Sequence, residues 1–409
     1  MAPFTPPAEG GAPLLSEDRA PPPPVVRILA DDLTGALDTG AQFTGLIGPV
    51  PVSLGGTEGV RSLAFDSATR DEPWEAARSR MPDLDPFFDG ADIAYRKIDS
   101  LLRGHTLQDI AAGLGVGRRR VCVLAPAFPA QDRVTRGGIQ LFRDRAGAWR
   151  PAGPPLPDAL QALGVPARLI ASPAELEGEG VLVCDAATDA DLAAVAEAGS
   201  RLARRFPGAL LWCGSAGLAR AVAGRPPPTV RPRLAPVLIV VGSDHAQSRA
   251  QIESFAEAYP AQRVEIAEIT PGLPGRVSAV LHVSGAALVS FRLGDSLDPP
   301  QMMQRIRAAL AKFLPAVERP GGLIVAGGET LRAICEVLGA ERLMVVGEIR
   351  AGIPAATLIG GLWDGLQVLS KSGAFGKPRT LVNLAAAIMP AASTPEIVAS
   401  NIVESGTWE

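Results

Sequence analysis

The chain has 409 residues, of which 47% are hydrophobic and 20% charged, and its 39 basic and 43 acidic side chains leave a formal charge of −4. This composition is that of a globular protein with two domains. It argues against a general nucleic-acid-binding surface, which requires a clustered excess of basic residues. No apolar run approaches the ~20 residues needed to cross a bilayer.

The first 24 residues include Pro21–Pro24 and show little hydrophobic periodicity, so residues 1–24 are predicted to be a disordered leader. They lack the basic and apolar regions of a secretory signal. Four widely spaced cysteines include no C-x-x-C pair, and only three histidines occur. We therefore expect a soluble, cytoplasmic protein with reduced thiols and without a multi-histidine zinc site.

Short apolar runs alternate along the chain with turns rich in Gly, Asp or Ser and with amphipathic stretches. Continuous Val, Ile and Leu runs are typical of strands buried on both faces, as in parallel sheets covered by helices. The alternation predicts an α/β fold with mainly parallel sheets and βαβ units. The predicted strands are Val25–Ala30, Ile93–Arg96, Val121–Ala125, Val181–Cys184, Ala209–Trp212, Val237–Val241, Val280–Val283, Leu323–Ala326 and Leu343–Val346.

A proline-rich segment between Gly224 and Pro232 marks the internal boundary. Such a segment continues neither a helix nor a central strand and is typical of a stiff linker. We predict one α/β domain over residues 25–225, a linker over 226–234 and a second α/β domain over 235–409. Two domains in tandem leave a cleft between them, which is the usual place for a ligand.

Polar residues directly after the apolar runs are the candidate site residues, because ligands of open α/β sheets bind beyond the carboxyl ends of the strands. Asp31 and Asp32 follow the first run and precede Thr34, Gly35 and a predicted helix. The two carboxylates could accept a proton from a substrate hydroxyl or hold a metal-bound water. Asp32 could equally serve only as the N-cap of that helix.

Charged side chains follow two further strands of the N-terminal half. Asp66 ends a short strand, and Lys97, Asp99, Arg103 and His105 lie within nine positions behind the next one. A solvated helix face would also carry charge, but it would not start with Asp and Ser at the end of a strand. Arg and Lys at such a position suit an anionic substrate, because a guanidinium binds a carboxylate through two parallel hydrogen bonds.

Three glycine-rich turns mark the C-terminal half, and two of them open predicted helices. Glycine lets the backbone approach a ligand closely, and helix N-termini offer free amides to an anion. Each turn alone is weak evidence for a ligand site, but three such turns in one domain predict a site for the phosphates of a nucleotide. The chain contains no Walker A, Rossmann or protein-kinase motif. The residues predicted to bind the nucleotide are Ser243, Gly327, Gly328, Glu329, Thr330, Lys371, Gly373 and Gly376.

Taken in series, these segments resemble the four-carbon acid sugar kinases, a family that includes D-threonate, D-erythronate and 3-oxo-tetronate kinases. The resemblance covers nearly everything after the proline-rich leader, and as a set the motifs are highly specific. They are Ala30–Ala36, Lys97–Ser100, Leu102–Gly104, Pro126–Pro129, Gly214–Ala219, Gly242–Ser243, Gly327–Thr330 and Lys371–Gly376.

The resemblance implies that the N-terminal domain binds a sugar acid and that the C-terminal domain binds most of the ATP. The family reaction phosphorylates the terminal hydroxyl of a four-carbon acid and gives a 4-phosphate. The nucleotide contacts implied by the motifs are Ser243, Gly327, Gly328, Glu329, Thr330 and Gly373. The implied residues around the sugar acid are Asp32, Asp66, Lys97, Asp99 and Arg103.

The chain departs from the family pattern at three places, one near the predicted substrate site, one at the predicted nucleotide site and one in the length of a segment. His105, which we place with Asp31 among the predicted substrate-binding residues, stands where the family often has Asn and leaves the identity of the substrate open. Asp244 and His245 replace the small residues that usually follow Gly-Ser. The stretch between Pro129 and Val181 is shorter than in typical members.

The resulting hypothesis is phosphoryl transfer across a cleft that can close. Lys97 and Arg103 would bind the substrate carboxylate, Asp32 would be the base for the far hydroxyl, and Asp99 is the alternative base. The glycine turns would hold the phosphates of ATP with Mg²⁺ bridging them, and no side chain is assigned as a direct metal ligand. Closure of the domains would exclude water from the reaction.

Two other functions fit the same fold. An NAD(P)-dependent dehydrogenase of sugar acids would also use glycine turns at strand ends, but the dinucleotide fingerprint is absent. A non-catalytic sugar-acid sensor would result if the altered turn at residues 244–245 no longer supported catalysis. The sequence does not name the sugar acid or its stereoisomer, and it leaves a homo-oligomer open.

Overall fold

The computed structural model describes residues 22–55, 59–80, 85–115, 119–144, 146–231, 234–292 and 298–389. Outside this part of the chain lie residues 1–21 of the predicted leader, 232–233 of the predicted linker and 390–409 of the predicted second domain. Within the described ranges, none of the helices combines the length and the apolar character needed to cross a membrane.

The N-terminal half alternates strands and helices, as its apolar runs predict. Its strands are rich in Val, Ile, Leu and Ala and are largely buried, because helices cover both faces of the sheet. The strands are β1 (Val26–Ala30), β2 (Val50–Ser53), β3 (Leu63–Asp66), β4 (Ile93–Lys97), β5 (Val121–Ala125), β9 (Ala167–Ile170), β10 (Gly180–Cys184) and β11 (Leu210–Gly214). The helices are α1 (Leu33–Ile47), α2 (Trp74–Ser79), α4 (Thr106–Gly115), α5 (Leu156–Ala162), α6 (Asp189–Arg205) and α7 (Ala216–Ala223).

Helices α1, α6 and α7 cover one face of this half, and α4 and α5 cover the other. Leu37 of α1, Leu192 of α6 and Leu218 of α7 share one apolar cluster. Ile110 of α4 and Leu160 of α5 belong to a separate cluster. A small antiparallel sheet follows β5 and consists of β6 (Arg133–Arg136), β7 (Ile139–Arg143) and β8 (Trp149–Pro151).

The C-terminal half repeats the alternation of strands and helices. Its strands are β12 (Val237–Val241), β13 (Arg263–Ile266), β14 (Ala286–Phe291), β15 (Gly322–Ala326), β16 (Arg342–Arg350), β17 (Ile353–Ile359) and β18 (Gln367–Lys371). Its helices are α8 (Ala246–Ala258), α9 (Leu273–Ser284), α10 (Pro299–Phe313), α11 (Gly328–Leu338) and α12 (Thr380–Ile388). The described residues of both halves also contain the short 3₁₀ helices η1 (Asp85–Phe88), η2 (Pro129–Gln131), η3 (Pro173–Glu175), η4 (Pro260–Gln262) and η5 (Leu314–Ala316).

One predicted strand is wrong. Residues Val280–Val283 lie in α9, and the strand β14 follows that helix. Leu273, Val277 and Leu281 are buried at a spacing of four residues, which is the spacing of one helix face. Gly285 then adopts a left-handed conformation, with φ of 71°, and ends the helix. The short apolar run is therefore the last turn of a helix rather than a strand.

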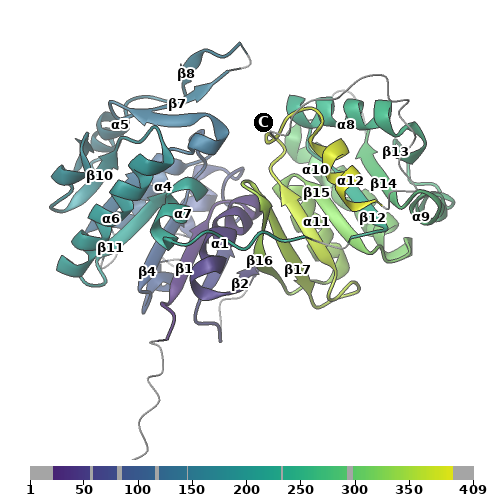
Figure 1. Ribbon diagram of the computed structural model, residues 1–409, viewed down its shortest axis with the longest axis horizontal. Coiled ribbons are helices and arrows are strands. Elements are labelled where there is room, and N and C mark those ends of the chain that lie inside the picture. Colours follow the sequence, from purple (N-terminus) through teal and green to yellow (C-terminus); the bar gives the residue numbers. More distant parts are fainter. Residues whose placement is uncertain are drawn as a thin grey trace, which may run out of the picture.

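In the described residues, strands from both halves form one sheet of 15 strands. Its order is β13-β14-β12-β15-β18-β17-β16-β2-β3-β1-β4-β11-β5-β10-β9. Neighbouring strands are parallel except where β16 pairs with β2 and β17, and where β17 pairs with β18. The predicted α/β fold with mainly parallel strands is confirmed, and Figure 1 shows the two halves on either side of β16 and β17.

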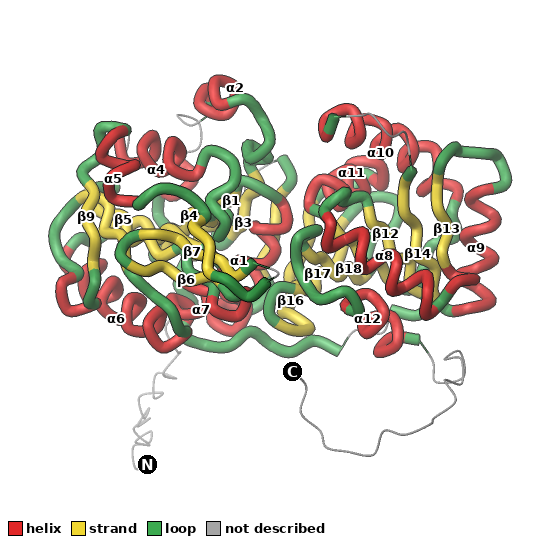
Figure 2. The backbone as a smooth tube through the Cα atoms, turned by 90° about the horizontal axis from the view of Figure 1, so that it is seen from above, coloured by secondary structure: helices red, strands yellow, loops and turns green. Residues whose placement is uncertain are grey.

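The halves are joined through β2 and β16, in which Val52 lies opposite Leu343. Gln42 of α1 donates a hydrogen bond to Glu348 of β16 at 3.1 Å, and the backbone of Val230 donates to the backbone oxygen of Glu348 at 2.9 Å. Seen from above in Figure 2, α1 and β16 lie near the middle of the molecule, with the remaining helices and strands to either side.

The twist of the sheet explains how both halves contribute to one site. Along the ladder, the parallel strands of the two halves run in opposite directions, because three antiparallel pairs separate β2 from β18. Six steps lead from β1 to β15. At about 20–25° of twist per step, this path turns the strand direction by roughly 120–150°. The carboxyl ends of β1 and β15 can therefore face the same cleft.

Candidate active site

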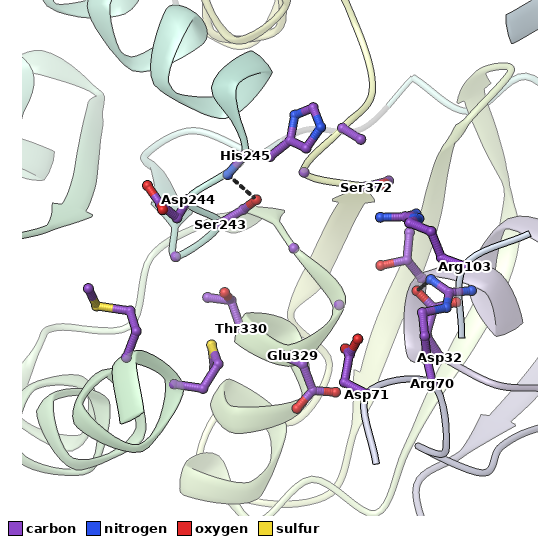
Figure 3. A pocket seen from close by; sticks show the side chains of 18 residues that line it. Asp32, Arg70, Asp71, Arg103, Ser243, Asp244, His245, Glu329, Thr330 and Ser372 are labelled. Carbon is purple, nitrogen blue, oxygen red and sulfur yellow. Dashed lines mark hydrogen bonds and ion pairs between the residues drawn. The ribbon is translucent and has the colours of Figure 1, made fainter. Parts of the chain in front are cut away.

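A cavity of about 290 Å³ lies between the two halves of the molecule (Figure 3). Both halves form its walls, in agreement with the predicted interdomain site. The N-terminal half contributes Asp32, Thr34, Arg70, Asp71 and Arg103. The C-terminal half contributes the three glycine turns and two side chains of α10, namely Gly242–His245, Gly327–Thr330, Ser372–Ala374, Met302 and Met303.

A smaller cavity of about 40 Å³ adjoins the first one. The two cavities share the lining residues Asp32, Thr34, Arg70, Arg103 and Ser372. The smaller cavity is the more highly charged, because four cationic side chains and three carboxylates line it. Its charged residues that the larger cavity lacks are Asp38, Lys97, Asp99 and Arg133.

Asp32 is both the cap of a helix and a wall of both cavities. It occupies the N-cap of α1, where its Oδ1 accepts a hydrogen bond from Gly35 N at 2.8 Å. Its Oδ2 forms an ion pair with Arg70 at 2.6 Å. Arg70 also donates to both oxygens of Asp31, at 2.8 and 2.7 Å. Burial raises the pKa of Asp32, although the charge of Arg70 opposes the rise. Asp31 lines neither cavity and holds Arg70 in place.

Asp99 is engaged on both of its oxygens. Arg103 donates to them at 2.8 and 2.9 Å, and the backbone nitrogen of Leu101 adds a third hydrogen bond at 3.2 Å. Burial alone would raise the pKa of Asp99, but the hydrogen bonds from Arg103 and the charge of Arg70 hold it well below its usual range. Asp99 is therefore a poorer proton acceptor than Asp32.

Lys97 ends β4 and is buried at the small cavity, where its Nζ donates to the backbone oxygen of the next residue at 2.7 Å. The neighbouring turn of α1 has room for it because position 35 is glycine. A Cβ added to Gly35 would lie 3.1 Å from Lys97 Nζ and 2.5 Å from Asp32 Oδ1. Arg133 of β6 also lines this cavity, and its guanidinium donates to the Ser100 hydroxyl.

Two polar side chains of α1 face the cavities without partners. Within the described residues, Thr34 Oγ1 and Asp38 Oδ1 are buried and make no hydrogen bond. Thr34 lines both cavities, and Asp38 lines the smaller one. Burial raises the pKa of Asp38 to about 7, although the charge of Lys97 opposes the rise. Such groups are costly to bury unless a ligand supplies the missing hydrogen bonds.

The glycine turns after β12, β15 and β18 pack closely on one another. A Cβ added to Gly242 would lie 2.3 Å from Thr330 Oγ1, and one added to Gly373 would lie 2.0 Å from Ser243 Oγ. Side chains at these two positions would separate the turns. Six of the eight residues predicted to bind the nucleotide thus line the large cavity, among them Ser243, Thr330 and Gly373.

The N-terminus of α11 opens into the large cavity. The helix begins at Gly328 with Gly327 as its N-cap at φ of 115°, and no side chain caps it. A helix start with uncapped amides and a positive dipole end binds phosphate. Thr34 approaches it from the other half, since a Cβ added to Gly328 would lie 2.8 Å from Thr34 Oγ1. These features fit the triphosphate of ATP.

Besides Asp31, two further residues predicted to contact the substrate line neither cavity. The carboxylate of Asp66 accepts a hydrogen bond from Arg332 of α11. His105 Nε2 lies 2.6 Å from the backbone oxygen of Glu72, and its ring packs on Trp74 with centroids 5.4 Å apart. Both residues support loops around the site instead of contacting the small cavity. His105 was predicted because it follows Arg103 in the sequence. The turn of the chain at this point directs its side chain toward Glu72 and Trp74.

Lys371 and Gly376 also lie outside the large cavity. Lys371 is fully buried, its Nζ has no hydrogen-bond partner in the described part of the chain, and burial lowers its pKa to about 7. Gly376 has φ of 94°, and a Cβ added to it would lie 2.6 Å from Thr380 Oγ1. Lys371 and Gly376 therefore support the loop after β18 from its buried side, whereas Gly373, which lies between them in sequence, lines the cavity.

The unusual Asp244 and His245 are accommodated at the start of α8. His245 is the N-cap, and its Nδ1 accepts a hydrogen bond from Gln247 N at 3.1 Å. Asp244 forms an exposed ion pair with Arg249 at 3.5 Å. The helix start is therefore intact despite this departure, and both residues line the large cavity.

Sequence reasoning did not select several lining residues. Thr34 and Asp38 are polar residues four positions apart on α1, a spacing that places two side chains on one face of a helix. Arg70 lies four residues after Asp66, in the segment that follows β3, and was not selected. Arg133 reaches the site only because the small sheet folds back, and no local signal predicts that contact.

Two family models match the chain. The sugar-binding N-terminal domain matches residues 26–153 and 157–222, and the nucleotide-binding C-terminal domain matches residues 238–381. The D-threonate kinase of Bordetella bronchiseptica is 30% identical over 89% of this chain and 98% of its own length. The D-threonate kinase of Cupriavidus necator is 31% identical over 87% of this chain and 95% of its own length.

Solved structures share the fold. A structure from Salmonella typhimurium LT2 has a TM-score of 0.63 at 18% identity and covers 88% of this chain and 98% of that one. A structure from Haemophilus influenzae has a TM-score of 0.59 at 17% identity and covers 86% and 97%. The named relatives favour a kinase over the dehydrogenase and the sensor. The chain therefore belongs to the four-carbon acid sugar kinase family and is a kinase, as its motifs predict.

Proposed function

We propose that this kinase transfers the γ-phosphoryl group of ATP to the terminal hydroxyl of a four-carbon sugar acid, a tetronate or 3-oxo-tetronate, and releases the 4-phosphate. One observation carries the proposal: the two cavities meet at Asp32 and Thr34. The larger cavity has the glycine turns and the helix start of a phosphate site, and the smaller has the charges of a carboxylate site. The predicted domains, 25–225 and 235–409, would then each hold one ligand.

The carboxylate of the sugar acid would bind to Lys97 and Arg133. Lys97 Nζ donates a hydrogen bond to a backbone oxygen, and an ammonium group has three donors in all. Arg103 was predicted for this role, but two of its nitrogens already bind Asp99. Arg103 lines both cavities, so it is better placed to neutralise the transferred phosphoryl group together with Arg70.

Asp32 would accept the proton of the attacking hydroxyl. It lines both cavities, and its raised pKa makes it a better base than the usual carboxylate. The pKa of the alternative base, Asp99, is held well below its usual range by the hydrogen bonds from Arg103 and the charge of Arg70, which makes it a weaker base. The terminal hydroxyl would therefore lie between Asp32 and the N-terminus of α11, in line with the γ-phosphate.

Mg²⁺ would accompany the phosphates of ATP. In the described ranges, the chain presents no cluster of three or more metal-binding side chains. Mg²⁺ in kinases is held mainly by phosphates and water with one or two carboxylates, so such a cluster is not required. Asp71 lines the large cavity and is the side chain best suited to hold the ion. When bound, the ion neutralises charge on the phosphates.

The proposal is tested by incubating the full chain with ATP, Mg²⁺ and a panel of four- to six-carbon sugar acids while ADP release is measured. Phosphorus and carbon NMR of the product then shows which oxygen carries the phosphate. We expect release with at least one tetronate or 3-oxo-tetronate and a phosphate on C4. Turnover restricted to longer acids, or a phosphate on another carbon, would contradict the proposed substrate or product.

A further inference from the structure

We propose that Asp38 is a specificity-determining residue that accepts a hydrogen bond from a hydroxyl on the carbon chain of the sugar acid. The inference rests on the proposed function. It explains why the site would select an acid with several hydroxyl groups over an acid of similar size without them. No other residue of the small cavity combines a carboxylate with an unused buried oxygen in the described part of the chain.

The first argument is burial without a partner. Asp38 is 9% exposed, and its Oδ1 makes no hydrogen bond in the described ranges. The amide of Gln42, one helical turn further along α1, donates instead to the backbone oxygen of Asp38 at 3.2 Å and to Glu348 at 3.1 Å. A buried carboxylate without donors is strongly destabilising, so the position calls for a ligand that donates hydrogen bonds.

The charges around Asp38 decide what kind of ligand fits. The charges of Lys97 and Arg133 favour its ionised form, and those of Glu348 and Asp32 oppose it. Two nearby cations disfavour a metal ion at this position, and the carboxylate itself repels an anion. A neutral hydroxyl donates a hydrogen bond without bringing charge. The carbon-chain hydroxyls of a sugar acid supply such donors beside the carboxylate that Lys97 and Arg133 would bind.

The position along α1 gives the third argument. Asp32 caps the helix, and Thr34 and Asp38 follow on the face that lines the cavities. At 1.5 Å of rise per residue, Asp38 lies about 6 Å further along the axis than Thr34. If the terminal hydroxyl of the sugar acid lies at Asp32, then Asp38 lies beside the carbons that are closer to the carboxylate end of the same molecule. A hydroxyl on C2 or C3 could then reach it.

The test compares affinities by calorimetry for a tetronate and for its 2-deoxy and 3-deoxy analogues, without nucleotide. The variants are Asp38→Ala, which removes the acceptor, and Asp38→Asn, which keeps the shape and removes the charge. The control is Thr39→Val on the same helix. The Thr39 hydroxyl is buried, makes no hydrogen bond within the described ranges and lines neither cavity. Circular dichroism and thermal unfolding confirm that each variant folds.

Asp38→Ala should weaken tetronate binding by about 10-fold to 100-fold, as expected for a hydrogen bond to a charged group. Asp38→Asn should show a smaller loss in the same direction. For at least one deoxy analogue the loss should shrink to about 3-fold or less, because that analogue lacks the donor. Thr39→Val should bind all three acids as the parent chain does.

Equal losses for the tetronate and for both analogues, or no loss at all, would overturn the inference. The binding assay does not depend on phosphoryl transfer. A chain that binds tetronate through Asp38 but releases no ADP would therefore end the proposed kinase reaction on this acid while leaving the role of Asp38 in place.

Discussion

Arg332 of α11 donates a hydrogen bond to the carboxylate of Asp66 at the end of β3, and this contact joins the two halves of the molecule. The side chains are 11% and 1% exposed, so the pair is buried. Burial raises the pKa of Asp66 to about 6, although the charge of Arg332 opposes the rise. Since α11 begins at Gly328, the pair also fixes the proposed phosphate-binding helix against the N-terminal half.

Asp66→Ala should lower the free energy of unfolding by about 3–5 kcal/mol, because it leaves the Arg332 guanidinium buried without its partner. Chemical denaturation measures the change. The double variant Asp66→Leu with Arg332→Leu should recover part of the loss, since it removes both charges. As a control, Glu197→Ala breaks the exposed pair with Arg201 and should change stability by roughly 0.5 kcal/mol or less. A loss for Asp66→Ala as small as that of the control would contradict the role of the buried pair.

Much of the site follows from one rule applied to the sequence, that ligands bind beyond the carboxyl ends of parallel strands. The rule placed Asp32, Lys97 and the turn at Gly327 in the vicinity of one another, and the structure brings all three to the cleft. It works because the side chain after a strand end is directed by the strand itself. It carries no information on residues further along a helix, such as Asp38.

Other parts of the site differ from the prediction: Lys371 and Asp66 were selected but line neither cavity, and Arg133 lines the small cavity but was not selected. Lys371 lies two residues after Leu369 on β18, so both point to the same face, and Leu369 packs in the apolar cluster beneath α8 and α12. Alternation along the strand could have revealed this. Arg133 depends on the position of the small sheet, and Asp66 depends on a partner from the other half, which only the assembled fold supplies.

Asp32→Asn should lower kcat for phosphoryl transfer by about 10²-fold to 10⁴-fold, the range for a lost general base. Asparagine can still cap α1, so the fold should persist, and the Kd for ATP should change little. Stopped-flow ADP release and nucleotide titration measure the two quantities. Asp191→Asn alters a capping carboxylate of α6 outside both cavities and serves as the control. Near-parental turnover of Asp32→Asn would assign the base to another group.

Gly328→Ala should impair transfer more than it impairs folding. Alanine favours helix over glycine, but its Cβ would lie 2.8 Å from Thr34 Oγ1 and 3.5 Å from Asp32 Oδ2, at the junction of the two cavities. We expect kcat to fall by at least about 10-fold, because small displacements of reacting groups are costly. Gly275→Ala in α9 meets open space and should leave kcat unchanged. Equal activities of the two variants would show that the junction is not where transfer occurs.

Lys371→Met should stabilise the protein, and the gain should shrink as pH rises. Burial lowers the pKa of Lys371 to about 7 from 10.5, so the unfolded chain binds the additional proton between these values. The stability of the parent chain therefore contains a contribution that rises across this window, and the variant lacks it. The total change is at most roughly 5 kcal/mol between the two limits.

Denaturation curves of the parent chain and the variant at pH 7, 8 and 9 give the difference directly, with the exposed Lys312→Met as control. A constant or growing advantage of Lys371→Met across this range would mean that Lys371 stays charged through an ion pair or a ligand. Its predicted contact with the nucleotide would then become the better explanation. A shrinking advantage would instead assign Lys371 to the support of the loop that carries Gly373, because a neutral amine beneath that loop offers no charge to a phosphate.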